Sequence, residues 1–250
     1  MRIDWHAHVK LSKKTEFSID YFRESVREAR DSGLDAIAMT EHFNTTRYMD
    51  VYEQLDRHYP YRDDYYDVDG FKVFPGMEVD VEHGGHILVV GPRSAVLALR
   101  ARLEPHVEPG RFVAFARLLD WCDEEGLLRI GAHPFRESNP LIGHDDATLR
   151  RLDGVDLNGK DLFTYGPRMK EQVEDWARAL GLPVVAGSDT HHPLQFGCVA
   201  NRLDDACETV AELAACVREG RYRIEVSACL ETKVKAAGLV KKLLKRQAAS

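Results

Sequence analysis

The stretch Arg2-Ile3-Asp4-Trp5-His6-Ala7-His8 joins a short, mostly apolar run to two histidines. Arg2–Trp5 is predicted to be a strand. Residues two apart on a strand point to the same side of a sheet, so His6 and His8 can present two imidazoles to one point. A single His-x-His is weak evidence, because a lone histidine is usually a core or capping residue. The interpretation therefore depends on whether other strands end in the same way.

Short apolar runs alternate with helical patterns along the rest of the chain. The predicted strands are Arg2–Trp5, Ala36–Thr40, Phe71–Val81, His86–Gly91, Leu127–Ala132, Gly154–Leu157, Pro183–Gly187 and Arg221–Val226. The predicted helices are Ser18–Ser32, Ser94–Leu103, Arg111–Glu125, Arg168–Leu180, Asp205–Glu219 and Glu231–Arg246. Such alternation is typical of an α/β protein with a mainly parallel sheet. About seven strand–helix units favour a barrel over an open sheet.

The chain has 250 residues, a length at which single α/β barrels are common. One domain is predicted for residues 1–250, with a strand and helix in 221–250 packed on it. The polar, Tyr-rich stretch Tyr48–Gly70 is interpreted as a helix followed by a loop over the barrel mouth. The basic residues of Lys233–Arg246 are interpreted as the solvated face of the last helix.

Composition excludes several classes of function. The formal net charge of −7 argues against a broad nucleic-acid-binding face, so nucleic acid is not expected except as a short oligonucleotide substrate. No apolar run is long enough to predict a membrane helix. The 5 cysteines are odd in number and form no C-x-x-C pair, which predicts reduced thiols in a cytoplasmic protein and argues against cysteine as a metal ligand.

Histidines and acids gather at the ends of the other predicted strands. The groups are Thr40-Glu41-His42, Gly76-Met77-Glu78, His86, Ala132-His133-Pro134 and Gly187-Ser188-Asp189-Thr190-His191. The carboxyl ends of parallel strands converge on one face of a barrel, where such enzymes place their sites. His86 reaches that face if its strand runs back from Phe71–Val81 in a hairpin. Asp189 alone could be a helix N-cap, and Glu78 alone a surface acid, but the strand ends taken together predict a metal cluster. Imidazole with carboxylate and no thiolate suits Zn²⁺, Mn²⁺ or Fe²⁺ better than Mg²⁺ or Cu⁺.

These motifs, in this order, resemble the polymerase and histidinol phosphatase (PHP) family of metal-dependent phosphoesterases. The resemblance extends from residue 1 to about residue 200. It implies a distorted (β/α)7 TIM-like barrel, with two or three divalent metal ions at the C-terminal ends of its strands. By resemblance, the first metal is held by His6, His8, Glu78 and Asp189. Glu78 bridges to a second metal held also by His86 and His133, and His42 and His191 hold a third.

The chain departs from the family pattern in two places. The family usually has Ser-Asp-Gly or Ser-x-His after the first motif, where it supplies a further ligand of the third metal. This chain has Ser12-Lys13-Lys14 there, so that ligand is missing or comes from elsewhere. The acid before His42 is Glu41, where aspartate is commoner, and we expect it to support the His42 ring.

The resemblance implies attack of a metal-bridging hydroxide on a small phosphomonoester or nucleotide, with Asp189 in the catalytic metal set. The alternatives are a histidinol-phosphate phosphatase, a hydrolase of amides or phosphotriesters on the same site, and a non-catalytic accessory module. Oligomeric state is left open.

Arg136, three residues after His133, is the first choice for holding the substrate phosphate, since its planar fork suits phosphate. The alternative is a surface ion pair with Glu137 or Asp120. Lys160 and His192 are further candidates for substrate binding, and Arg47 and Lys14 are weaker ones. His83 competes with His86 as a ligand, but the apolar strand after His86 favours His86.

Overall fold

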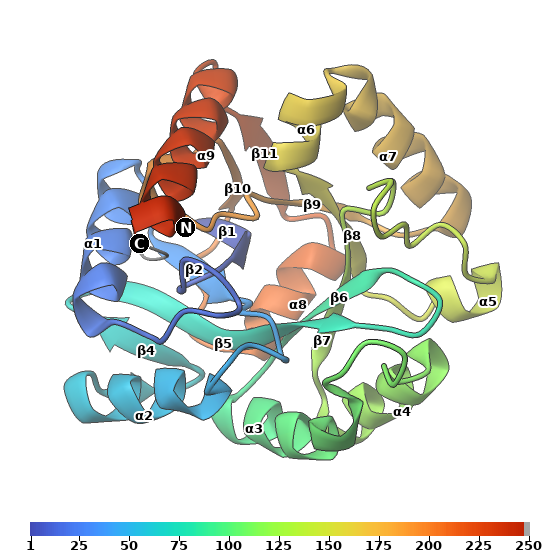
Figure 1. Ribbon diagram of the computed structural model, residues 1–250. Coiled ribbons are helices and arrows are strands. Elements are labelled where there is room, and N and C mark those ends of the chain that lie inside the picture. The colour runs from blue at the N-terminus through green and yellow to red at the C-terminus, as the bar shows by residue number, and fades with distance from the viewer. Residues whose placement is uncertain (248–250) are drawn as a thin grey trace.

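The computed structural model describes residues 1–247 and arranges the strands around a central barrel (Figure 1). The strands are β1 (Arg2–Ala7), β2 (Ala36–Met39), β3 (Tyr61–Arg62), β4 (Tyr65–Val68), β5 (Phe71–Asp80), β6 (His86–Val90), β7 (Leu128–Ala132), β8 (Gly154–Asn158), β9 (Val184–Gly187), β10 (Val199–Leu203) and β11 (Tyr222–Val226). Nine of them are hydrogen-bonded in the order β11-β10-β1-β2-β5-β6-β7-β8-β9.

Helices cover the outside of this sheet and close one end of it. They are α1 (Ile19–Asp31), α2 (Tyr48–His58), α3 (Arg93–Arg102), α4 (Phe115–Glu125), α5 (Asp146–Leu149), α6 (Gly159–Tyr165), α7 (Arg168–Leu180), α8 (Val210–Arg218) and α9 (Leu230–Gln247). Two short 3₁₀ turns, η1 (Glu104–His106) and η2 (Pro193–Gln195), complete the set. The predicted α/β barrel is confirmed.

The barrel closes where β9 returns to β1. The N–H of Asp189 donates to the His6 carbonyl at 2.8 Å, and the N–H of His8 donates to the Thr190 carbonyl at 3.0 Å. Nearer the start of the two strands, the buried Asn201 amide of β10 bridges the Ile3 carbonyl and the backbone of Ala186. A side chain therefore replaces part of the strand ladder, which accounts for the distortion of the ring.

β6 runs antiparallel to both of its neighbours, β5 and β7. The hairpin predicted before His86 is therefore present, and the first residue of β6 lies at the same end as the last residues of the parallel strands. This end is the mouth of the barrel.

The opposite end is filled by α8, which lies behind the ring in Figure 1. Its apolar residues Leu213 and Val217 belong to one buried cluster with barrel-lining residues such as Ile3, Phe74 and Ile130. A second cluster packs the outer helices against the outward faces of the strands. The barrel interior is therefore apolar at the end opposite the mouth, which we call the lower end.

Two predicted helices begin later than the sequence pattern indicated. Residues 111–114 are not helical, because Val113 forms a bridge with Val81 and accepts a hydrogen bond from the N–H of Glu82. α8 begins at Val210 rather than Asp205, because Thr209 and Glu212 form a capping box there. β10 was missed, since polar Asn201 and Arg202 interrupt its apolar pattern.

The segment Tyr48–Gly70 is only partly as predicted. Its helix, α2, is present, but the loop over the mouth is wrong. The chain instead forms the hairpin β3–β4, and Tyr66 of β4 pairs with Val73 near the start of β5. This hairpin therefore extends the sheet at the end remote from the mouth.

Within residues 1–247, no helix is long and apolar enough to cross a membrane. Four cysteines are buried and Cys229 is exposed, and all five are free thiols.

Candidate metal centre

A β-bulge in β1 aims the histidine pair into the barrel mouth. Ile3, before the bulge, packs in the interior cluster, whereas Ala7, after it, packs in the outer cluster. The extra residue between Asp4 and Ala7 reverses which side chains face inward. His6 and His8 therefore face the interior although they follow an apolar strand.

Glu78 of β5 connects the ends of three strands. Its N–H donates to the Glu41 carbonyl just past β2 at 3.0 Å, and its carbonyl accepts from Phe43 at 2.9 Å. Across β6, His86 opens the antiparallel strand and pairs with Ala132, next to His133. The side chains that the sequence placed on separate strands thus meet around one carboxylate.

His133 and Asp189 have left-handed backbones, with φ of 30° and 55°. This region is uncommon for residues other than glycine, and such strain gathers at functional sites. Both residues come directly after or close behind a barrel strand, β7 and β9. The turn in the backbone brings their side chains over the mouth.

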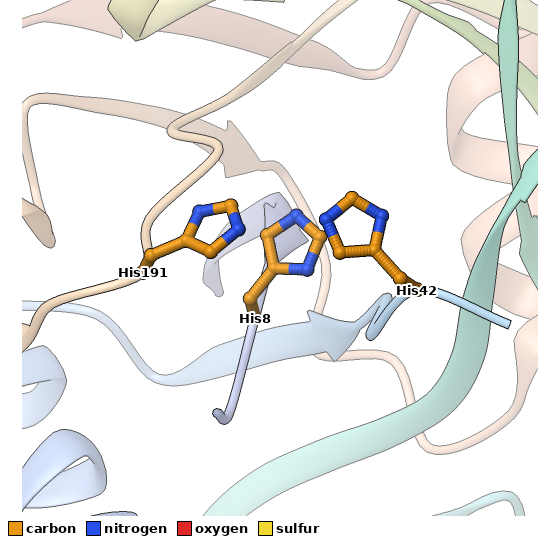
Figure 2. A group of neighbouring side chains, drawn as sticks. All are labelled: His8, His42 and His191. Carbon is orange, nitrogen blue, oxygen red and sulfur yellow. The ribbon is translucent and has the colours of Figure 1, made fainter. Parts of the chain in front are cut away.

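The candidate ligands form three overlapping groups, and within each group one ligand atom per residue lies within 4.8 Å of the others. The groups are His6, Glu78 and His133; His6, His8 and Asp189; and His8, His42 and His191. Figure 2 shows the third, with the His8 ring between those of His191 and His42. The ring centroids of His8 and its two neighbours are 4.0 and 4.3 Å apart.

Glu78 lies at the centre of the whole set. Its oxygens are 2.6 Å from Nδ1 of His86, 2.7 Å from Nδ1 of His42, 3.1 Å from Nε2 of His133, and 3.4 and 3.5 Å from Nε2 of His6 and His8. Burial raises the pKa of Glu78, but the neighbouring histidines outweigh it and hold that pKa well below its usual value. Burial lowers the pKa of His42 to about 4 and that of His133 to about 3. Burial acts in the same direction on His6, His8 and His86, but the neighbouring carboxylates outweigh it and raise the pKa of these three rings, that of His86 to about 9. Metal binding requires an ionised carboxylate and neutral imidazoles, so a cation would replace protons on these three rings.

The residues fit a multinuclear metal site. Several buried atoms in the mouth lie close to polar atoms of other ligands but make no hydrogen bond of acceptable geometry with them, although buried polar groups are almost always hydrogen-bonded. They include Nε2 of His6, both ring nitrogens of His8, Nδ1 of His42 and Oε2 of Glu78. Divalent cations at the centre of these groups would satisfy these atoms except Nδ1 of His8, which faces Glu41. The nitrogen and oxygen donors suit Zn²⁺, Mn²⁺ or Fe²⁺.

A second layer of carboxylates orients the rings, as is usual for metal-binding histidines. Asp156 lies 3.1 Å from Nδ1 of His6, which leaves Nε2 to face Glu78. Asp80 lies 2.8 Å from Nε2 of His86, which leaves Nδ1 to face Glu78. Both contacts select the nitrogen that can serve as a ligand.

Glu41 orients a different histidine from the one we predicted. Its carboxylate accepts hydrogen bonds from the backbone N–H groups of Val9, Lys10 and His42, and lies 3.7 Å from Nδ1 of His8. It therefore supports the His8 ring and not the His42 ring. The longer side chain reaches across to β1 because β1 and β2 are adjacent strands.

Arg136 lies beside the candidate ligands, but each of its guanidinium nitrogens already contacts a protein oxygen. One terminal nitrogen is 2.8 Å from Oδ2 of Asp189, and its other nitrogens donate to Asp161 and Asn158 at 2.7–3.1 Å. The alternative, a surface pair with Glu137 or Asp120, is not what the structure has. Oδ1 of Asp189 faces His8 and His6 at 3.4 and 3.9 Å, so the two oxygens of this carboxylate face opposite partners.

The remaining predicted residues divide between the mouth and the surface. Nζ of Lys160 is 3.5 Å from Oδ2 of Asp189, and the His192 ring accepts from the N–H of Leu194 at 3.4 Å. Arg47 pairs with Glu16 and Asp50 in solvent, and Lys14 is exposed. His83 is exposed, which leaves the ligand position to His86.

Lys13 belongs to the Ser12-Lys13-Lys14 segment that departs from the family pattern, and its side chain points toward the candidate metal ligands. Its Nζ lies 3.2 Å from Oδ2 of Asp80, whose other oxygen contacts His86. A cation therefore stands at the edge of the cluster where the resemblance implied a ligand.

Sequence reasoning missed Asp156, Asn158 and Asp161. The first two alternate on the inward face of β8, and that alternation of polar residues within an apolar strand was the available signal. The predicted strand ended at Leu157, which hid the pattern. Asp161 lies in the first turn of α6 and carries no local signal of its role.

Comparison with known proteins agrees with this geometry. Residues 167–222 match the family model described as PHP-associated, and this segment supplies β9, Asp189 and His191. The resemblance to the PHP family is confirmed. No curated protein sequence matches the chain.

Solved structures share the fold at low sequence identity. The crystal structure of PsfC from Pseudomonas syringae has a TM-score of 0.79 at 20% identity, covering 97% of this chain and 98% of that one. The lesion-specific endonuclease PfuEndoQ from Pyrococcus furiosus has a TM-score of 0.66 at 19% identity, covering 90% of this chain and 58% of that one. An amidohydrolase from Chromobacterium violaceum, with bound sulfate and no metal, has a TM-score of 0.51 at 16% identity, covering 88% and 97%.

Proposed function

We propose that the protein is a metal-dependent phosphoesterase that cleaves a small phosphomonoester or a nucleotide. The observation that carries the proposal is the set of buried, unpartnered imidazole and carboxylate atoms around Glu78. In that site, divalent ions would supply an activated water and neutralise charge on a phosphoryl group.

The residues of the chain would hold and orient this centre. His6, His8, Glu78 and Asp189 would hold a first ion, and His86 and His133 would complete a second site with Glu78. Asp156 and Asp80 fix the rings of His6 and His86 through their other nitrogens. Preorganised ligands of this kind lower the reorganisation needed during reaction.

Arg136 would bind the substrate phosphate only through Nη1, because Asp161 and Asn158 already take Nε and Nη2. Its contact with Oδ2 of Asp189 also compensates the negative charge of that carboxylate. Nζ of Lys160 lies 3.5 Å from the same oxygen of Asp189, and the Lys160 side chain is 46% exposed. Together they would attract an anion to the metal face.

Hydrolysis of another bond is the competing proposal, because the structural neighbours include an amidohydrolase and an endonuclease. The experiment compares three substrates with added Mn²⁺ or Zn²⁺: p-nitrophenyl phosphate, bis(p-nitrophenyl) phosphate and p-nitroacetanilide. The proposal predicts fastest release from the monoester, and no release by His6→Ala. The matched control is His83→Ala, which removes an exposed histidine outside the site. Faster cleavage of the diester or the anilide would replace the monoester assignment, and no cleavage at all would favour an accessory role.

A further inference from the structure

A cavity of 330 Å³ opens beside the metal face. Asp189 and His191 form part of its wall, and the rest comes from α6, η2 and α9. α6 and α9 stand side by side above the barrel mouth in Figure 1. A group held at the candidate metal centre would therefore border this cavity, which we term the α9 cavity.

One face of α9 lines the cavity. Val234, Gly238 and Lys241 recur three and four residues apart, so they share a side of the helix. Phe163 of α6 and Leu239 are 39% and 57% exposed, which is unusual for such large apolar side chains. The walls thus offer apolar contact to a group that enters from solvent.

The polar lining is strongly positive. Lys160, Lys235 and Lys241 all border the cavity, whereas Asp189 is its one lining carboxylate among the described residues. Within residues 1–247, Lys235 and Lys241 have no carboxylate within ion-pair distance. Burial, together with the charges of Lys245 and Lys160, lowers the pKa of Lys241 to about 8. Lysines left without anionic partners in a half-closed cavity suit an anionic ligand.

We propose that the α9 cavity binds the leaving group of the substrate, and that this leaving group has an apolar or aromatic part and a second anionic group. The inference rests on the proposed phosphoesterase function. The reacting phosphoryl group would lie at the metal face, the apolar part against Phe163 and Leu239, and the second anion on Lys241 with Lys160 or Lys235.

Two substitutions on α9 separate the two features of this cavity. Lys241→Gln removes the charge that faces the second anion. Gly238→Leu fills the space, since a Cβ at Gly238 meets no atom within 4 Å and its backbone is helical. Lys242→Gln is the matched control, because Lys242 is the next residue of the same helix and is exposed outside the cavity.

The test compares 4-carboxyphenyl phosphate with phenyl phosphate by kcat/KM, and the corresponding phosphonates by calorimetric Kd on the metal-loaded protein. The proposal predicts that the wild type prefers the carboxylated compound in both assays. Lys241→Gln should lower that preference about tenfold, the scale of one lost contact between charged groups. Gly238→Leu should weaken binding of both phosphonates, and Lys242→Gln should leave both assays within about twofold of wild type.

The outcomes keep the two proposals apart. Suppose that the wild type hydrolyses both phosphates without preference and that Lys241→Gln and Gly238→Leu have the same kcat/KM and Kd as the wild type. This result would overturn the proposal that the α9 cavity binds the leaving group, but not the proposed phosphoesterase activity. Preferential, Lys241-dependent binding of the carboxylated phosphonate without hydrolysis would support the cavity and overturn the phosphoesterase. Failure of the phosphonates to bind at all would overturn the cavity.

Discussion

At its lower end the barrel is filled by α8, and at its mouth by histidines and carboxylates carried on the same strands. On β1, Ile3 packs against the lower cluster and His6 faces Glu78, only three residues further along. At the lower end only Nε1 of Trp5 in the interior cluster lacks a hydrogen bond among the described residues, whereas at the mouth several buried nitrogens and oxygens lack one. The α8 end therefore serves the stability of the fold, and the mouth serves ligand binding.

The largest effect is expected from a substitution that disturbs the mouth without replacing a candidate metal ligand. Gly187 lies where a Cβ would come within 2.3 Å of Cβ of His6 and 3.0 Å of its backbone nitrogen. Gly187→Ala should therefore displace His6 and lower metal affinity by about 100-fold, the upper end of the range for losing ligand orientation. Metal competition titration measures it.

Gly143→Ala is the control for that substitution, because a Cβ at Gly143 meets no atom within 4 Å and its φ is not in the left-handed region. It should bind metal as the wild type does. Unaltered metal affinity in Gly187→Ala would show that the approach of β9 to His6 does not position the site.

The lower end should respond in the opposite way. Leu213 of α8 is fully buried in the interior cluster. Leu213→Ala should lower the free energy of unfolding by about 2–5 kcal/mol, the cost of a large-to-small change in a packed core. Urea denaturation measures this loss, and metal content of the folded variant should not change. Loss of metal alongside stability would mean that the two ends are coupled.

How far the sequence predicts each end also differs. The mouth was predictable because His6, His8, His133 and Asp189 follow apolar runs that converge in any parallel barrel. The closure of the ring was not, since it depends on the Asn201 amide bridging two strands far away in sequence. Asp161 and the occupied fork of Arg136 were equally hidden, because a contact between α6 and the β7 loop leaves no periodic signal.

Substitution of Arg136 tests how the mouth combines substrate binding with metal binding. Replacing it with alanine should lower kcat/KM by about 100-fold, because a contact to charged groups is lost. Since Arg136 also contacts Asp189, metal affinity should fall by about tenfold. Arg136→Lys should recover part of both losses. Kinetics and metal titration equal to wild type in both variants would assign Arg136 no role at the site.

The smallest expected effect concerns pH. Burial first, and then Lys245 and Lys160, lower the pKa of Lys241 to about 8. Lys241 is therefore charged below pH 8 and neutral above it, so the preference for 4-carboxyphenyl phosphate over phenyl phosphate should fall as the pH rises from about 7 to 9. Using the ratio of the two substrates cancels titration at the metal centre that both share. A ratio that stays constant in wild type, or falls equally in Lys241→Arg, would exclude this assignment.

The central claim is that the unpartnered groups in the mouth hold metal ions. The direct measurement is elemental analysis of the folded protein after loading with Mn²⁺ or Zn²⁺ and removal of free metal, for the wild type, His6→Ala and His83→Ala. The account predicts about two or three ions per chain in the wild type and in His83→Ala, and a loss of at least about one ion in His6→Ala. A folded wild type that retains no stoichiometric metal, or a His6→Ala variant that retains the full complement, would contradict it.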